Sequence, residues 1–255
     1  MKKHLTLAWI AMLLAVAITT TMDFLGYVMF SAFPLIVLTI AFWIIARLSR
    51  TEIGLRWGRG KYYRWALAYP LVVLGITALI AFVTGDFSIA TTNNRNEIIN
   101  LVAGLVIGPI GVLITEEGFF RGVLWGLFGR ARYSATKTLY VTTAAFVVWH
   151  VSAVLAESEF GLPLSQIPIY LVNATLMGLI WGSLRMASGS IIVASVCHAI
   201  WNALAYGLFG YGEKVGLLGV SQTWLLGPEV GLLGILLNGL FYLWLRRQIA
   251  REGTN

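Results

Sequence analysis

The stretch ITEEGFFRGVLWG, residues 114–126, places two adjacent glutamates and an arginine inside an otherwise apolar segment. Apolar residues continue on both sides, so the charges lie within this segment and not at its end. An ionisable side chain at the centre of a bilayer costs about 3 kcal/mol or more, and such groups face the interior of a helix bundle or a water-filled cavity. The reason for burying Glu116, Glu117 and Arg121 together therefore bears on both fold and function.

The amino-acid composition indicates the environment in which these charges lie. The chain has 255 residues, of which 58% are hydrophobic and 11% are charged, whereas soluble domains carry about 25% charged residues. The mean hydropathy is +0.81. These values exclude an ordinary soluble domain and indicate a polytopic membrane protein. The single cysteine, Cys197, excludes an internal disulfide.

The apolar runs predict an all-α, polytopic membrane helix bundle with about eight transmembrane helices and an active site within the bundle. Helices are expected because the backbone must satisfy its own hydrogen bonds in lipid. The predicted segments lie near 5–22, 27–46, 65–84, 98–128, 136–156, 167–184, 190–208 and 229–245. We expect a single membrane domain over 1–255, with a motif-bearing catalytic core at 105–205.

The basic residues predict the orientation in the membrane. With eight spans, one side receives Lys2, Lys3, Arg47, Arg50, Arg56, Arg59, Lys61, Arg64, Arg130, Arg132, Lys137, Arg185, Arg246, Arg247 and Arg251. The other side receives Arg95 and Lys214. The positive-inside rule then places both termini in the cytoplasm, and we expect an integral protein of a prokaryotic cytoplasmic membrane. The basic residues are dispersed over short loops, which favours contact with the lipid bilayer and argues against a nucleic-acid partner.

Helical geometry divides the roles of the two glutamates. Glu117 and Arg121 are four residues apart, so they share a helix face and can pair. Glu116 is rotated by about 100° and has no partner on its own helix. The simplest structural interpretation is a charge cluster that fixes helix packing. The alternative is a functional carboxylate at Glu116.

Two further residue pairs, each containing a histidine, favour the functional interpretation. Phe146 and His150 are four residues apart on the fifth segment, and His198 and Asn202 are four residues apart on the seventh. The third histidine of the chain, His4, lies near the N-terminus. A glutamate, two histidines and an asparagine form a plausible hydrolytic set, with a base, an orienting imidazole and donors for an oxyanion.

The three patterns resemble the motifs of a known family. Glu-Glu-x-x-x-Arg at 116–121, Phe-x-x-x-His at 146–150 and His-x-x-x-Asn at 198–202 are similar to those of the CPBP family. These are CAAX-protease and bacteriocin-processing intramembrane endopeptidases, related to the type II CAAX prenyl endopeptidases. The resemblance implies a multi-helix bundle that cleaves a peptide or protein substrate at the membrane.

The resemblance also implies a role for each motif residue. The general base is Glu116, with His150 as its partner on the attacking water. The oxyanion donors are His198 and Asn202. The residues that support the site or orient the substrate are Glu117, Arg121 and Phe146.

The motif residues are compatible with a metal site and with a metal-free site. Glu116, His150 and His198 form a His₂Glu set, which some catalytic zinc sites use. The same residues can instead work without a cofactor, with His198 donating to an oxyanion. We expect the metal-free arrangement, because Asn202 shares a helix face with His198 and an amide suits a pair of donors better than a metal sphere.

Two other function classes are compatible with the sequence. One is a non-catalytic membrane immunity factor or regulatory scaffold that keeps the protease fold. The other is a transporter with a proton-relay glutamate. The complete motif set favours the enzyme, because a scaffold would be free to lose Glu116 or His150. The sequence does not identify the substrate.

Overall fold

The computed structural model describes residues 1–89, 94–156, 161–211 and 214–252. The long helices are α1 (Lys2–Phe24), α2 (Pro34–Ala46), α4 (Gly60–Thr84), α5 (Asn94–Ile114), α7 (Ala135–Leu155), α8 (Ile167–Ser188), α9 (Ile191–Leu204) and α11 (Leu232–Glu252). The short helices are η1 (Val28–Phe30), α3 (Arg50–Ile53), α6 (Trp125–Arg130) and α10 (Thr223–Leu226), and the π-helices are η2 (Glu117–Leu124) and η3 (Ala205–Phe209). A small antiparallel hairpin joins β1 (Gly210–Tyr211) to β2 (Lys214–Val215).

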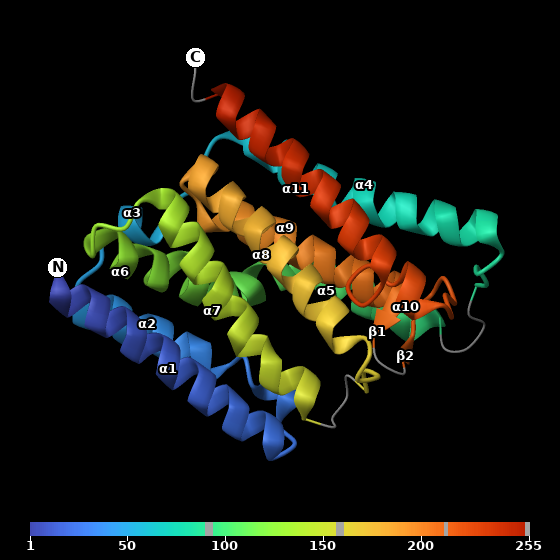
Figure 1. Cartoon of the computed structure of the whole chain (residues 1–255), viewed down its shortest axis with the longest axis horizontal. Coiled ribbons are helices and arrows are strands. Elements are labelled where there is room, and N and C mark those ends of the chain that lie inside the picture. The colour runs from blue at the N-terminus through green and yellow to red at the C-terminus, as the bar shows by residue number, and fades with distance from the viewer. Residues whose placement is uncertain (90–93, 157–160, 212–213, 253–255) are drawn as a thin grey trace.

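The predicted all-α membrane bundle is confirmed. Seven helical segments of the described chain are long and apolar enough to cross a membrane: 2–24, 28–46, 60–84, 95–130, 135–155, 167–188 and 191–209. The eighth predicted segment forms α11, which is helical but is not one of these seven. Asn238, Arg246 and Arg247 lower its hydropathy. It nevertheless packs along α4 and α8 like the other long helices (Figure 1).

Small residues form the inner face of α1. On α1 the buried side chains are Ala8, Ala11, Ala15 and Thr19, together with Asp23, which repeat every three or four residues. Large apolar side chains of the same helix lie on the outside. Lipid is as apolar as leucine, so helices in membranes associate through close packing of small residues. The outward leucines therefore match a lipid environment.

The contact between α5 and α9 follows the same rule. Gly104 and Gly108 of α5 face Ala203 and Ala199 of α9, and a β-carbon at Gly104 would lie 3.0 Å from that of Ala203. Helix α5 otherwise exposes large apolar side chains such as Val106 and Ile107. This helix therefore lies at the edge of the bundle and carries the first motif from the periphery toward the centre.

Different secondary-structure elements lie at the two ends of the bundle (Figure 1). The N-terminus, α3, α6 and the start of α9 lie at one end, and the C-terminal end of α11 reaches the same side. The hairpin β1–β2 and α10 lie at the opposite end. We call the first the basic end, because it carries the basic loops described above, and the second the hairpin end.

Candidate active site

A π-helix carries the first motif through the core. The segment 95–130 passes from α5 into η2 and then α6. In η2 all residues from Glu117 to Leu124 are buried. In the widened turn the carbonyl oxygen of Leu113 lies close to residue 118. A β-carbon added at Gly118 would lie only 2.6 Å from this oxygen. Glycine is therefore required there, and π-turns of this kind occur frequently at functional sites.

Glu117 and Arg121 form a completely buried ion pair. Arg121 Nη1 lies 3.1 Å from Glu117 Oε1, and both side chains are 0% exposed, so the pairing that their spacing predicts is present. Arg121 also donates to the carbonyl oxygen of Gly178 on α8 at 3.2 Å. Its guanidinium carbon lies 4.4 Å from the ring centroid of Phe146 on α7. One cation thus connects three segments of the bundle.

Glu117 also orients His198. His198 Nδ1 lies 3.0 Å from Glu117 Oε1, and its ring stacks on Trp181 at 3.6 Å. An ionised carboxylate only accepts hydrogen bonds, so Nδ1 carries the hydrogen. Nε2 of His198 then points away from Glu117, toward Glu116.

His150 is oriented by its own helix. Its Nδ1 lies 2.9 Å from the carbonyl oxygen of Phe146. A carbonyl oxygen only accepts, so Nδ1 of His150 donates and Nε2 of the neutral ring keeps a lone pair. The ring of His150 also lies 4.3 Å from that of Phe146. The four-residue spacing of the second motif thus fixes which nitrogen faces the centre of the site.

Glu116 lies between the two histidines. Its Oε2 is 3.9 Å from Nε2 of His150 and 3.9 Å from Nε2 of His198, which is too long for a direct hydrogen bond. This buried oxygen has no hydrogen-bond partner among the described residues. It borders a cavity of about 40 Å³, which we call the catalytic cavity and which has room for water. The residues that line it are Glu116, Phe146, His150, Tyr170, Ala174, Met177, Trp181, His198, Asn202, Tyr206 and Glu229.

The motif residues thus meet in one place. Glu116, His150, His198 and Asn202 line the cavity together with Phe146, while Glu117 and Arg121 lie behind His198. Within the described ranges, no three His, Cys, Asp or Glu side chains are grouped so that they could hold a metal ion. Cys197, the neighbour of His198, is buried and does not line the cavity.

Glu229 is a cavity residue that the sequence did not indicate. It lies in the loop between α10 and α11 and accepts a hydrogen bond of 2.6 Å from Trp201 Nε1. Burial raises the pKa of Glu229 to about 7. The signal available in the sequence was a single acidic residue at the edge of the eighth apolar segment, and no helical spacing connects it with the three motifs.

Buried amides fix the loop that carries Glu229. Asn173 of α8 donates to the backbone carbonyl of Glu229 at 2.9 Å and accepts from Asn238 of α11 at 2.9 Å. Tyr69 of α4 donates to Asn238 at 2.8 Å. Each of these side chains is fully buried. The network holds loop 227–231 against the cavity, so Glu229 occupies a defined position.

These features define a class of protein: a polytopic membrane bundle with a buried glutamate–histidine site. Residues 95–204 match the family described as "Type II CAAX prenyl endopeptidase Rce1-like". The chain therefore carries an Rce1-like domain, and the resemblance to the CPBP family is confirmed. This match supports an integral membrane protease that acts on peptide substrates. No curated protein and no solved structure matches the chain.

The site predicts different stability effects for the two adjacent glutamates. Glu117→Gln leaves the Arg121 cation buried without its counter-charge, so the free energy of unfolding should fall by about 3 kcal/mol. Glu116→Gln removes no ion pair of this kind and should change it by less than about 1 kcal/mol. Thermal unfolding of the two variants in detergent measures the difference. Equal melting temperatures would contradict the structural role of the Glu117–Arg121 pair.

Proposed function

We propose that this protein is an intramembrane endopeptidase that hydrolyses a peptide bond with a water molecule activated by Glu116 and His150. The observation that carries the proposal is the position of Glu116 Oε2, 3.9 Å from both histidine Nε2 atoms at the edge of a buried cavity. A water molecule there can donate one hydrogen to the carboxylate and one to the lone pair of His150. General-base help of this kind accelerates reactions by about 10²–10⁴-fold.

His198 and Asn202 are the proposed donors to the oxyanion. Because Nδ1 of His198 donates to Glu117, a donor at Nε2 requires the doubly protonated ring. Two carboxylates face that imidazolium: Glu117, which also pairs with Arg121, at 3.0 Å and Glu116 at 3.9 Å. The amide of Asn202 is neutral and needs no such partner. Preorganised donors of this kind are each worth about 10²–10³-fold in rate.

Glu229 is the proposed proton donor to the leaving amine. The pKa of about 7 keeps a large fraction of this carboxyl group protonated near neutral pH. Water adds its oxygen to the carbonyl carbon, and Glu116 takes a proton from that water. As the C–N bond breaks, Glu229 gives its proton to the nitrogen. The products are a carboxylic acid and an amine, and exchange with water restores both glutamates.

The Glu116 proposal is tested by comparing membrane peptides from cells with the unaltered chain and with Glu116→Gln. We expect Glu116-dependent cleavage products to disappear, with a fall of about 10³-fold in the rate of the purified protein, while the protein level stays unchanged. Mass spectrometry of the membrane fraction measures the products. Near-normal cleavage by Glu116→Gln would exclude its role as base and would favour the scaffold interpretation.

The Glu229 proposal predicts a pH effect. A general acid must be protonated, so the rate should fall as pH rises through about 7, and Glu229→Gln should lower the rate at pH 6 by about 10²-fold. The other titratable groups at the cavity are Tyr170, Tyr206, His150, His198 and Glu116. A pH–rate profile in detergent measures the effect. An alkaline decline that persists unchanged in Glu229→Gln would exclude Glu229 as the proton donor.

Trp201→Phe is the matched control for Glu229. It removes the hydrogen bond to Glu229 Oε1 but keeps the carboxyl group. A purely structural Glu229 would make both variants lose stability and activity together. A proton donor makes the rate of Glu229→Gln fall much further than that of Trp201→Phe, at comparable melting temperatures.

The metal-free proposal predicts that chelation has no effect. Purified protein treated with a strong chelator should keep its peptidase activity, and elemental analysis should find less than about one equivalent of tightly bound transition metal, because the proposed chemistry uses only side chains and water. His150→Ala serves as the comparison for metal content. Activity that is lost on chelation and restored by zinc, with one zinc per chain lost in His150→Ala, would overturn the metal-free proposal.

A further inference from the structure

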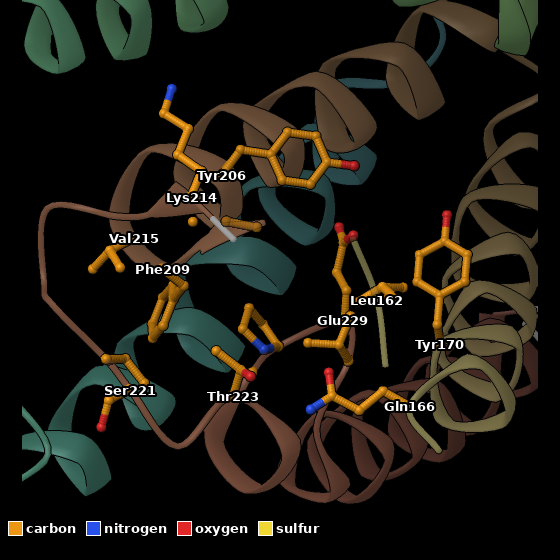
Figure 2. A pocket seen from close by; sticks show the side chains of 16 residues that line it. Leu162, Gln166, Tyr170, Tyr206, Phe209, Lys214, Val215, Ser221, Thr223 and Glu229 are labelled. Atoms are coloured by element: carbon orange, nitrogen blue, oxygen red, sulfur yellow. The ribbon is translucent and has the colours of Figure 1, made fainter. Parts of the chain in front are cut away.

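A larger pocket adjoins the catalytic cavity. Its volume is about 270 Å³, and we call it the outer pocket. It shares Tyr170, Tyr206 and Glu229 with the catalytic cavity. Figure 2 shows the Glu229 side chain rising between the two tyrosines. The two spaces therefore meet at Glu229, and a polypeptide that fills the outer pocket reaches the proposed catalytic residues.

The outer pocket opens at the hairpin end of the bundle. Its lining comes from α8, η3 and α10 and from residues at 162–166, 209–210, 214–215 and 220–230, which lie between the helices at that end (Figure 1). Val215 at its rim is 58% exposed. A second groove of about 390 Å³ runs between α5 and α9 and borders Asn202. It contains Glu97 and Lys214, whose ion pair of 3.2 Å lies at the same end.

The path from the catalytic cavity toward the basic end is filled. Glu117, Arg121 and Trp181 are buried there, with exposures of 0%, 0% and 1%. Nearer the basic end, Arg185 donates to the backbone oxygen of Arg121 at 3.0 Å and to that of Glu52 at 3.0 Å. The catalytic cavity is thus closed on this side by an ion pair and by hydrogen bonds to the backbone.

The charge distribution assigns the two ends to the two sides of the membrane. Every lysine and arginine of the chain belongs to the basic end except Arg95, Lys214 and the buried Arg121. Basic residues in short loops collect on the cytoplasmic side. The hairpin end, where the outer pocket opens, therefore faces away from the cytoplasm.

We infer that the site is loaded from the extracytoplasmic side, through the outer pocket, by an extended segment of an exported or membrane-anchored polypeptide. This inference rests on the proposed function. The pocket is smaller than most ligand sites, which run from roughly 300 to 1,000 Å³, so it accommodates a few side chains and not a folded domain. Leu162, Phe209, Val220 and Val230 make most of its wall apolar. A protein confined to the cytoplasm would meet only the closed end.

Cysteine labelling tests the orientation without any need for activity. The native Cys197 is buried and should stay unlabelled. Val215→Cys reports the rim of the outer pocket, and Trp57→Cys, at a residue that is 77% exposed in the loop before α4, is the matched control at the basic end. With a membrane-impermeant maleimide, we expect Val215→Cys to react in intact cells and Trp57→Cys to react only after permeabilisation. The reverse result would overturn the inference.

Blocking the outer pocket tests the route. Leu162→Cys lies within the lining, so its modification by the same reagent in intact cells should abolish the Glu116-dependent peptides. Permeabilised cells with modified Trp57→Cys should keep producing them. The peptides should also derive from extracytoplasmic segments of their parent proteins. Continued production after modification of Leu162→Cys, or peptides of cytoplasmic origin, would exclude this route.

The two arms separate the inference from the proposed function. If no Glu116-dependent peptide exists in any cells, the endopeptidase proposal fails. The labelling of Val215→Cys and Trp57→Cys still decides which side of the membrane the outer pocket faces. If the peptides exist but the labelling is reversed, the endopeptidase proposal stands and the extracytoplasmic route is wrong.

Discussion

The ion pair between Glu117 and Arg121 is the interaction on which the rest of the structure depends. A guanidinium that is 0% exposed inside a membrane bundle needs a counter-charge and further acceptors, because the desolvation of an unpaired ion costs several kcal/mol. Arg121 obtains them from Glu117, from a carbonyl oxygen on α8 and from the ring of Phe146 on α7. Helices that supply these partners cannot shift independently. The same carboxylate orients His198, so core packing and site geometry share one group.

The π-helix η2 explains how two adjacent glutamates serve different purposes. Glu117 turns toward Arg121 and His198, while Glu116 faces the catalytic cavity between the histidine Nε2 atoms. The widened turn is possible because Gly118 lacks a side chain that would meet the carbonyl of Leu113. The bundle thus separates a structural carboxylate from the cavity-facing one within a single turn of helix.

Much of the fold could be predicted from the sequence, because length and hydropathy control which segments enter lipid. All eight predicted segments are helical, with edges that differ by a few residues. The pairing of Glu117 with Arg121 was predictable because helical spacing alone brings them together. The contact of Glu117 with His198 joins residues that are 81 positions apart in the sequence. Helical periodicity predicts contacts only between residues a few positions apart, so it could not predict this one.

The π-helix η2 and the cavity residue Glu229 were not predicted, because both depend on tertiary packing and not on local sequence patterns. The glycines of η2 also fit simple close packing, so they did not reveal a π-helix. Glu229 reaches the cavity only because Asn173 and Asn238 hold its loop in place. These contacts depend on how α8 and α11 meet, which hydropathy does not encode.

The buried amide network also has a consequence for synthesis of the chain. Loop 227–231 comes after every other residue of the catalytic cavity in the order of translation. It is held by α11, the long helix that is least apolar, through the bond from Asn238 to Asn173. A nascent chain that has inserted α1 to α9 still lacks one wall of the cavity. The last wall of the cavity is therefore added only after α11 has been synthesised and has packed against α8.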